Sequence, residues 1–184
     1  MAIATASLLI SGVAAFADTY TFALIPANGN IGGPAGSTIG WGYTITNNSA
    51  TNFLDALAVN AGLFQHATLD SGDYFDFPLV APITTVTVSF VPADGSGFGA
   101  GLAALTWVAN APIGFTNSGN FDFSACWASS SGACIANAPD ALAPYSASVT
   151  NVMPEPSAGA TAILGILMLS VSVLTGKLTS RIRG

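Results

Sequence analysis

Apolar and polar residues alternate with a period of two along much of this chain. In the run 39–46, an apolar or aromatic residue at every odd position alternates with glycine or threonine. This alternation indicates a strand that has one buried face. It predicts strands at 19–24, 39–46, 85–90, 121–127 and 145–150, and gives a weaker signal at 53–59, 74–80 and 102–108.

Short clusters of Asn, Gly, Ser and Asp separate these segments. Their composition predicts turns at 28–30, 47–49, 94–97 and 117–120. Seven to nine short antiparallel strands, apolar on one face and rich in Thr and Ser on the other, favour an all-β fold. We expect a single antiparallel β-sandwich over residues 18–150, with a closed β-barrel as the alternative.

One segment adds detail to the expected sandwich. Residues 34–49 begin with Pro-Ala-Gly, continue as the aromatic strand Ile-Gly-Trp-Gly-Tyr, and end in Asn-Asn-Ser. This order resembles the second strand of bacterial immunoglobulin-like modules. The resemblance implies an Ig-like β-sandwich and implies no activity.

The charges are few and unevenly placed. Charged residues are 7% of the 184, and the formal net charge is -6. The only three bases, Lys177, Arg181 and Arg183, lie in the last eight residues. A protein that binds nucleic acid by neutralising phosphates needs clustered Lys and Arg, so we expect no nucleic-acid partner.

The N-terminal 17 residues have the character of an export signal. They are uncharged and apolar, and Ala15-Phe16-Ala17 fits the small-residue cleavage pattern. Cleavage there would leave Asp18 as the first residue of the mature chain. The positively charged start of such signals is missing. A buried N-terminal helix or strand is the alternative.

The C-terminus has the character of a membrane anchor. Residues 158–176 carry no charge, and as a helix these 19 residues would be about 28 Å long, close to the hydrocarbon thickness of a bilayer. Lys177, Arg181 and Arg183 follow, and positive charge holds that side of a span in the cytoplasm. We therefore expect a transmembrane helix at 158–176 and a basic cytoplasmic tail at 177–184. The alternative is a buried helix of a globular domain.

A motif precedes this span. Pro154, Glu155 and Pro156 lie in the segment 151–157, which the two prolines keep extended. The motif, the span and the basic end together resemble the PEP-CTERM sorting signal of Gram-negative bacteria. The resemblance implies recognition by an exosortase, a membrane-embedded enzyme. It also implies an inner-membrane precursor that is later released to the cell surface or the exopolysaccharide matrix.

The two cysteines, Cys126 and Cys134, flank the short segment 127–133, which we expect to be a loop or hairpin tip. An exported chain meets an oxidising compartment, so we expect a disulfide between them. Two free thiols are the alternative.

Asp70, Asp73 and Asp76 recur at every third position. Carboxylate oxygens are ligands for Ca²⁺, so these residues are weak candidates for a calcium site. Their spacing is not that of an EF-hand, and solvated loop carboxylates are the favoured interpretation.

His66 and the three tryptophans are the remaining candidates for chemistry. His66 stands alone, without a G-x-S-x-G motif elsewhere, and a structural role is favoured over catalysis. Trp41, Trp107 and Trp127 could stack on sugar rings. Their positions in the alternation favour core packing instead.

We therefore expect an exported, non-enzymatic surface or matrix protein with a structural or adhesive role. The alternatives are a calcium- or carbohydrate-binding module of the extracellular matrix and a hydrolase of matrix polymers. The composition suits a hydrated polysaccharide environment, so exopolysaccharide is an expected partner. No cofactor is expected apart from the candidate Ca²⁺.

Mass spectrometry of the surface-located protein tests both signals. We expect a chain from Asp18 to near Pro154 in cells that contain the cognate exosortase, and an unprocessed C-terminus in cells that lack it. A full-length C-terminus in both strains would mean that the span is a permanent anchor.

Overall fold

The structure is a computed structural model, and it describes residues 18–94 and 99–151. These residues contain eleven strands. The described residues up to Thr150 form one compact unit. The strands are β1 (Tyr20–Ile25), β2 (Asn30–Gly33), β3 (Thr38–Asn47), β4 (Phe53–Ala61), β5 (Ala67–Asp70), β6 (Leu79–Val80), β7 (Thr84–Val88), β8 (Ala103–Trp107), β9 (Thr116–Ala128), β10 (Cys134–Asn137) and β11 (Ala141–Val149).

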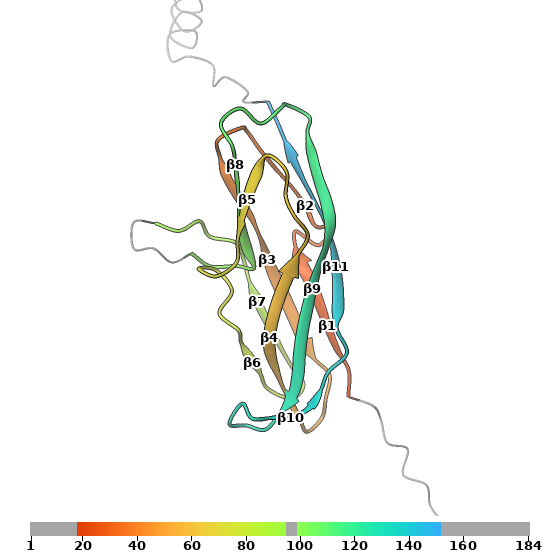
Figure 1. Cartoon of the computed structure of the whole chain (residues 1–184). Coiled ribbons are helices and arrows are strands. Elements are labelled where there is room, and N and C mark those ends of the chain that lie inside the picture. The colour runs from red at the N-terminus through yellow and green to blue at the C-terminus, as the bar shows by residue number, and fades with distance from the viewer. Residues whose placement is uncertain (1–17, 95–98, 152–184) are drawn as a thin grey trace, which may run out of the picture. The chain divides into compact units, whose positions relative to one another are not determined.

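The five-stranded sheet is organised around β3. Its path is β1-β3-β8-β5, and β7 also pairs with β3; all pairs are antiparallel. β7 pairs with the second half of β3 and β8 with the first half. Between β7 and β8 the chain leaves the sheet as a protruding loop, which Val91 and Ala100 close at its base (Figure 1).

The six-stranded sheet follows the path β2-β11-β9-β4-β6, and β10 also pairs with β9. β2 and β11 run parallel, whereas the other pairs are antiparallel. The longest strand, β9, pairs with β4, β10 and β11. The strands thus divide into two sheets, and they do not close into one barrel.

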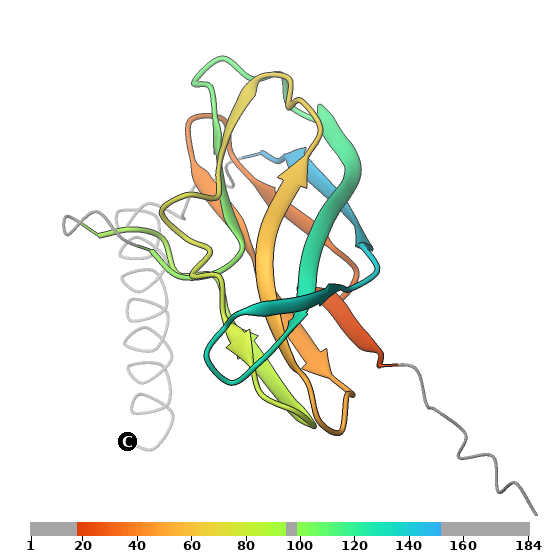
Figure 2. The same cartoon turned by 60° about the horizontal axis from the view of Figure 1, so that its bottom comes forward.

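The core lies between the two sheets. In Figure 1, β4 and β9 lie in front of β3, and Figure 2 shows β4 and β9 side by side from a second direction. Aromatic rings meet across this interface: Phe22 stacks on Phe123 at 4.6 Å between ring centroids, and Trp41 meets Phe121 edge-on at 5.1 Å. Side chains alternate across a strand, so burying one set turns the other set outward.

The predicted all-β class is confirmed, and each strongly predicted strand is present. Of the weaker segment 74–80, only Leu79 and Val80 form a strand. The predicted turn at 117–120 is wrong, because these residues continue β9 and pair with β11, Gly119 opposite Tyr145. The short strands β2, β5 and β10 were not predicted, since four residues each carry too little alternation.

Among the described residues there is no helix with the length and apolar character needed to cross a bilayer. Several predicted segments lie outside the described residues: the signal peptide 1–17, nearly all of the linker 151–157, the span 158–176 and the tail 177–184.

Gly29, the residue before β2, lies very close to the backbone of β11. Its φ is +67°, and a Cβ there would lie 2.1 Å from the carbonyl oxygen of Pro144. The Gly29 carbonyl accepts hydrogen bonds from Trp41 Nε1 and from the Ser146 amide. Gly132 has a similar φ of +81° but open space where its Cβ would be.

Gly29→Ala should therefore destabilise the protein more than Gly132→Ala. We expect about 1 kcal/mol for Gly132→Ala, from the left-handed backbone alone. Gly29→Ala should cost about 1–3 kcal/mol more, from overpacking against Pro144. Urea unfolding of both variants measures the difference, and equal losses would contradict the close approach.

Candidate functional site

A groove of about 350 Å³ lies where the segment after β5 meets the base of the protruding loop. It is lined by Gly72, Asp73, Tyr74, Phe75, Asp76 and Gly99. Two of the three acidic residues singled out in the sequence, Asp73 and Asp76, are therefore at this groove. Its volume is within the range of small-ligand pockets, at about 300–1,000 Å³.

Buried aromatic rings hold the acidic residues at the rim of the groove. Tyr74 and Phe75 are buried, whereas Asp73 and Asp76 are exposed. The Phe75 ring packs edge-on against Tyr43 at 5.0 Å. Tyr74 stacks on Phe90, and its hydroxyl accepts a hydrogen bond from the Ala93 amide, which joins this segment to the loop base.

One hydrogen bond fixes Asp76 in place. The Tyr43 ring is fully buried between the sheets, and its hydroxyl donates to Asp76 Oδ1 at 2.6 Å. Burial first, and then the hydrogen bond and charge of Asp76, raise the pKa of Tyr43 above its usual value. Tyr43 therefore remains a donor at physiological pH, and one carboxylate oxygen of Asp76 is held toward the core.

The structure does not bring Asp70, Asp73 and Asp76 together as a calcium site. Asp70 Oδ1 instead accepts backbone hydrogen bonds from Gly72 at 3.0 Å and Asp73 at 3.4 Å. In the described residues, the one group of three potential metal ligands within 4.8 Å of one another is Asp55, Cys126 and Cys134. Its two sulfur atoms are joined in a disulfide, so they are not thiolate ligands.

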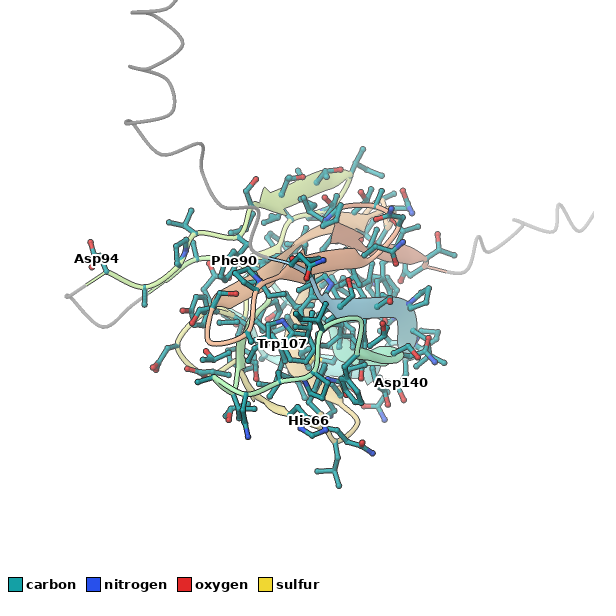
Figure 3. The ribbon with its side chains drawn as sticks, turned by 90° about the horizontal axis from the view of Figure 1, so that it is seen from above. His66, Phe90, Asp94, Trp107 and Asp140 are labelled. Carbon is teal, nitrogen blue, oxygen red and sulfur yellow. A yellow bond between two sulfur atoms is a disulfide. The ribbon has the colours of Figure 1, made fainter. Side chains whose placement is uncertain are left out.

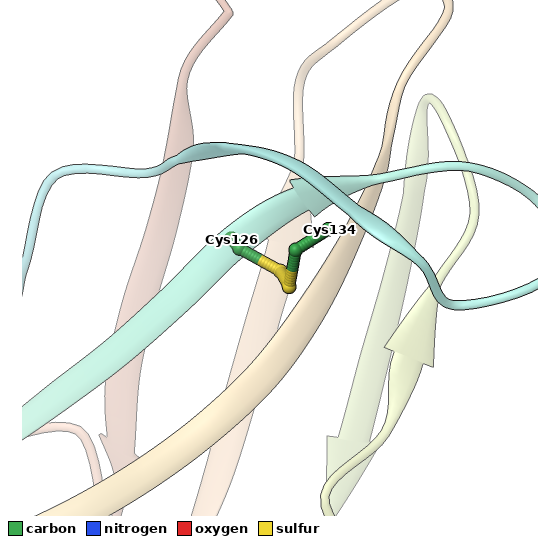
Figure 4. Close-up of a disulfide and its surroundings, with 2 residues drawn as sticks. All are labelled: Cys126 and Cys134. Carbon is green, nitrogen blue, oxygen red and sulfur yellow. A yellow bond between two sulfur atoms is a disulfide. The ribbon is translucent and has the colours of Figure 1, made fainter.

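The predicted disulfide between Cys126 and Cys134 is present (Figure 4). It joins β9 to β10, with 5.7 Å between the two Cα atoms. The loop that it closes is short, so the chain-entropy model gives a stabilisation of about 2–3 kcal/mol. Neither cysteine is free.

The three tryptophans belong to the core, as the alternation predicted. Trp41, Trp107 and Trp127 are 0%, 1% and 6% exposed, so none presents a stacking face. His66 is exposed at the end of the domain seen in Figure 3. Its ring contacts Phe115 edge-on at 4.7 Å.

The outer face of the five-stranded sheet carries rows of threonine. Register places Thr21, Thr46 and Thr85 in one row across β1, β3 and β7. A second row joins Thr38, Thr106 and Thr68 across β3, β8 and β5. Hydroxyls pair across the strands, Thr46 with Thr85 at 2.9 Å and Thr38 with Thr106 at 2.9 Å. We call this surface the threonine face. Its rows are ordered and uncharged, and Asp70 lies on the same face at the end of β5, two residues after Thr68.

A second, smaller hollow of about 160 Å³ lies beside Tyr20 and is also lined by Asp18 and Asp140. The Tyr20 hydroxyl donates to the carbonyl oxygen of Pro139. Burial, followed by the charges of Asp140 and Asp122, raises the pKa of Tyr20 to about 12. The negative charges disfavour a phenolate at this position.

Sequence reasoning missed the hydrogen bonds of the Tyr43 and Tyr20 hydroxyls. Tyr43 and Asp76 are 33 positions apart, and Tyr20 and Pro139 are 119 apart, so no local pattern links them. Other predicted residues lie outside the described ranges. They are Ala15 and Ala17 of the cleavage pattern, Pro154, Glu155 and Pro156 of the sorting motif, and Lys177, Arg181 and Arg183.

Comparison with models of protein families, with curated proteins and with solved structures finds no match to this chain.

The raised pKa of Tyr20 predicts a loss of stability at alkaline pH. The folded state holds the Tyr20 proton more tightly than the unfolded state does, because the pKa is about 12 in the folded state and 10.0 in the unfolded state. The stability that comes from this difference is complete below pH 10.0 and is lost as the pH rises through about 12. Tyr20→Phe should make the free energy of unfolding fall less steeply over this window, as measured by urea unfolding at several pH values.

The slope with pH is the relevant quantity, because Tyr20→Phe also removes the hydrogen bond to Pro139 at every pH. Asp140→Asn serves as the partner variant and should move the Tyr20 titration down toward its usual value. An unchanged slope in Tyr20→Phe would contradict the assigned environment.

Proposed function

We propose that this protein is an exported, non-enzymatic component of the cell surface or the extracellular polysaccharide matrix, with a structural or adhesive role. A single Ig-like β-sandwich carries this role. The C-terminal segment resembles the sorting signal of exosortase substrates, and in this proposal it sorts the protein. The sorting signal consists of Pro154, Glu155 and Pro156, the span 158–176 and the basic tail.

Strand order supports the Ig-like assignment. In Ig-like sandwiches one sheet has the order A-B-E-D and the other contains C, F and G. Here β1, β3, β8 and β5 follow the first order, and β4, β9 and β11 follow the second. β7 and β8 together act as strand E, interrupted by the protruding loop.

The threonine face is the observation that carries the proposed role. Its rows present hydroxyl and methyl groups without a charge, and no Lys or Arg occurs anywhere before residue 177. Such a surface exchanges hydrogen bonds with water and with sugar hydroxyls and repels neither. The disulfide adds weak support for export, because disulfides persist in oxidising compartments.

Carbohydrate binding in the groove is the second candidate, and the Tyr43–Asp76 bond favours it. An ionised carboxylate only accepts hydrogen bonds, and sugar hydroxyls donate them. Asp73 and Asp76 stand at the rim with an exposed Phe77 next in sequence, which is 49% exposed and contacts Phe75. This combination suits a neutral sugar ring with a polar edge and an apolar face.

Retention of the protein in purified host exopolysaccharide tests both candidates. Thr87 is exposed on the threonine face, where its hydroxyl pairs with that of Thr44 at 3.2 Å. Thr87→Asp places a charge there, and we expect it to reduce retention several-fold. Ser118→Asp is the matched control, an exposed polar residue on the outer face of the other sheet, and should leave retention unchanged.

The double variant Asp73→Asn and Asp76→Asn separates the groove from the face. Loss of retention in this variant alone would favour the carbohydrate-binding module. If none of the variants changes retention, or the parent protein is not retained, the adhesive role is wrong.

A further inference from the structure

One end of the domain is built from three loops and the point where the chain leaves it. The loops are 34–37, 62–66 and 108–115, and the chain leaves after β11 at Thr150. Backbone hydrogen bonds join them: Gly36 donates to Val108, Val108 to His66, and Gly114 to Val149. We call this the exit end, and Figure 3 looks onto it.

The exit end presents apolar side chains to solvent. Leu63 is 100% exposed, Ile113 is 68% exposed and Val108 is 40% exposed. Their neighbours in sequence are anchored. Phe64 stacks on Tyr145 at 5.1 Å, and the Gly114 amide bonds the Val149 carbonyl at 2.9 Å. The protruding side chains are therefore carried by fixed backbone, and their exposure does not come from a loose tip.

The exit end also lacks acidic residues. All eight acids between residues 18 and 151 lie outside its three loops and outside 149–151, and His66 is the one ionisable side chain in these segments. The domain contains no base, so these acids leave the rest of the domain with a net negative charge that the exit end does not share. An anionic lipid surface therefore repels the rest of the domain more than it repels this end.

Chain length places this end close to the predicted membrane span. Only six residues, 152–157, separate the last described residue from the span at 158–176. Even fully extended, six residues reach only about 20 Å. Any membrane that holds the span must lie within that reach of the exit end.

We propose that the exit end rests on the lipid surface while the protein is anchored, with Leu63 and Ile113 inserted among the headgroups and upper acyl chains. This inference rests on the proposed function, because it requires residues 158–176 to anchor the chain. Apolar side chains gain by leaving water for the interface, and fixed loops lose little conformational freedom when they insert.

Tryptophan quenching by brominated lipid tests the contact. The full chain is reconstituted into vesicles of phosphatidylcholine and phosphatidylglycerol, with or without bromine on the acyl chains. Leu63→Trp and Ile113→Trp each place a reporter at the exit end, and the native tryptophans are buried. Both reporters should shift to shorter wavelength and lose emission in brominated vesicles, beyond the loss of the parent chain.

Ile135→Trp is the matched control. Ile135 is an isoleucine of similar exposure, 61%, on β10 at the other end of the domain (Figure 1). Its emission should not depend on bromine.

The outcomes separate the contact from the anchor. A chain that does not float with the vesicles lacks the anchor, which overturns the proposed sorting and this inference together. A chain that floats while all three reporters respond alike overturns the lipid contact alone. A shift that follows protein concentration and not bromine would mean that a second copy covers Leu63 and Ile113, which also overturns it.

Discussion

Aromatic packing between the two sheets is the constraint on which the remaining structure depends. Trp41 and Tyr43 from β3 and Phe121 and Phe123 from β9 are fully buried, and such rings dominate the energetics of a core. Because neighbouring side chains point to opposite faces, this packing also determines what faces outward. It turns the threonines of β3 to solvent, and it puts Cys126, which precedes the buried Trp127, on the side opposite the core.

A domain without Lys or Arg must satisfy its carboxylates by other means. For three of them a hydroxyl, a side-chain amide and backbone N–H groups take the place of bases, whereas the buried Asp122 Oδ1 has no hydrogen-bond partner among the described residues. Tyr43 donates to Asp76, the Asn52 side chain donates to Asp18 at 2.7 Å, and the Gly72 amide donates to Asp70. These donors position the acids without neutralising them. The domain therefore keeps its negative charge, which suits neutral partners better than anionic ones.

The two proposals concern different parts of the domain surface. The threonine face and the groove, the two surfaces proposed to meet a matrix polymer, lie on the flank of the sandwich. The exposed Leu63 and Ile113 lie at the exit end, which is free of acids and lies next to the chain's departure toward the predicted span. In the proposed arrangement, the sandwich contacts a membrane at its end and keeps its flank available.

The sequence by itself determined the all-β class, the strongly alternating strands, the burial of the tryptophans and the pairing of the cysteines. Each follows either from the local alternation of apolar and polar residues or from the short sequence separation of the two cysteines. Both patterns can be read from a single stretch of chain. Only the tertiary structure decided that 117–120 continues β9, that Tyr43 holds Asp76, that Asp70 caps a turn away from a shared site, and that Leu63 and Ile113 share one end. These depend on residues tens of positions apart, which the core packing alone brings together.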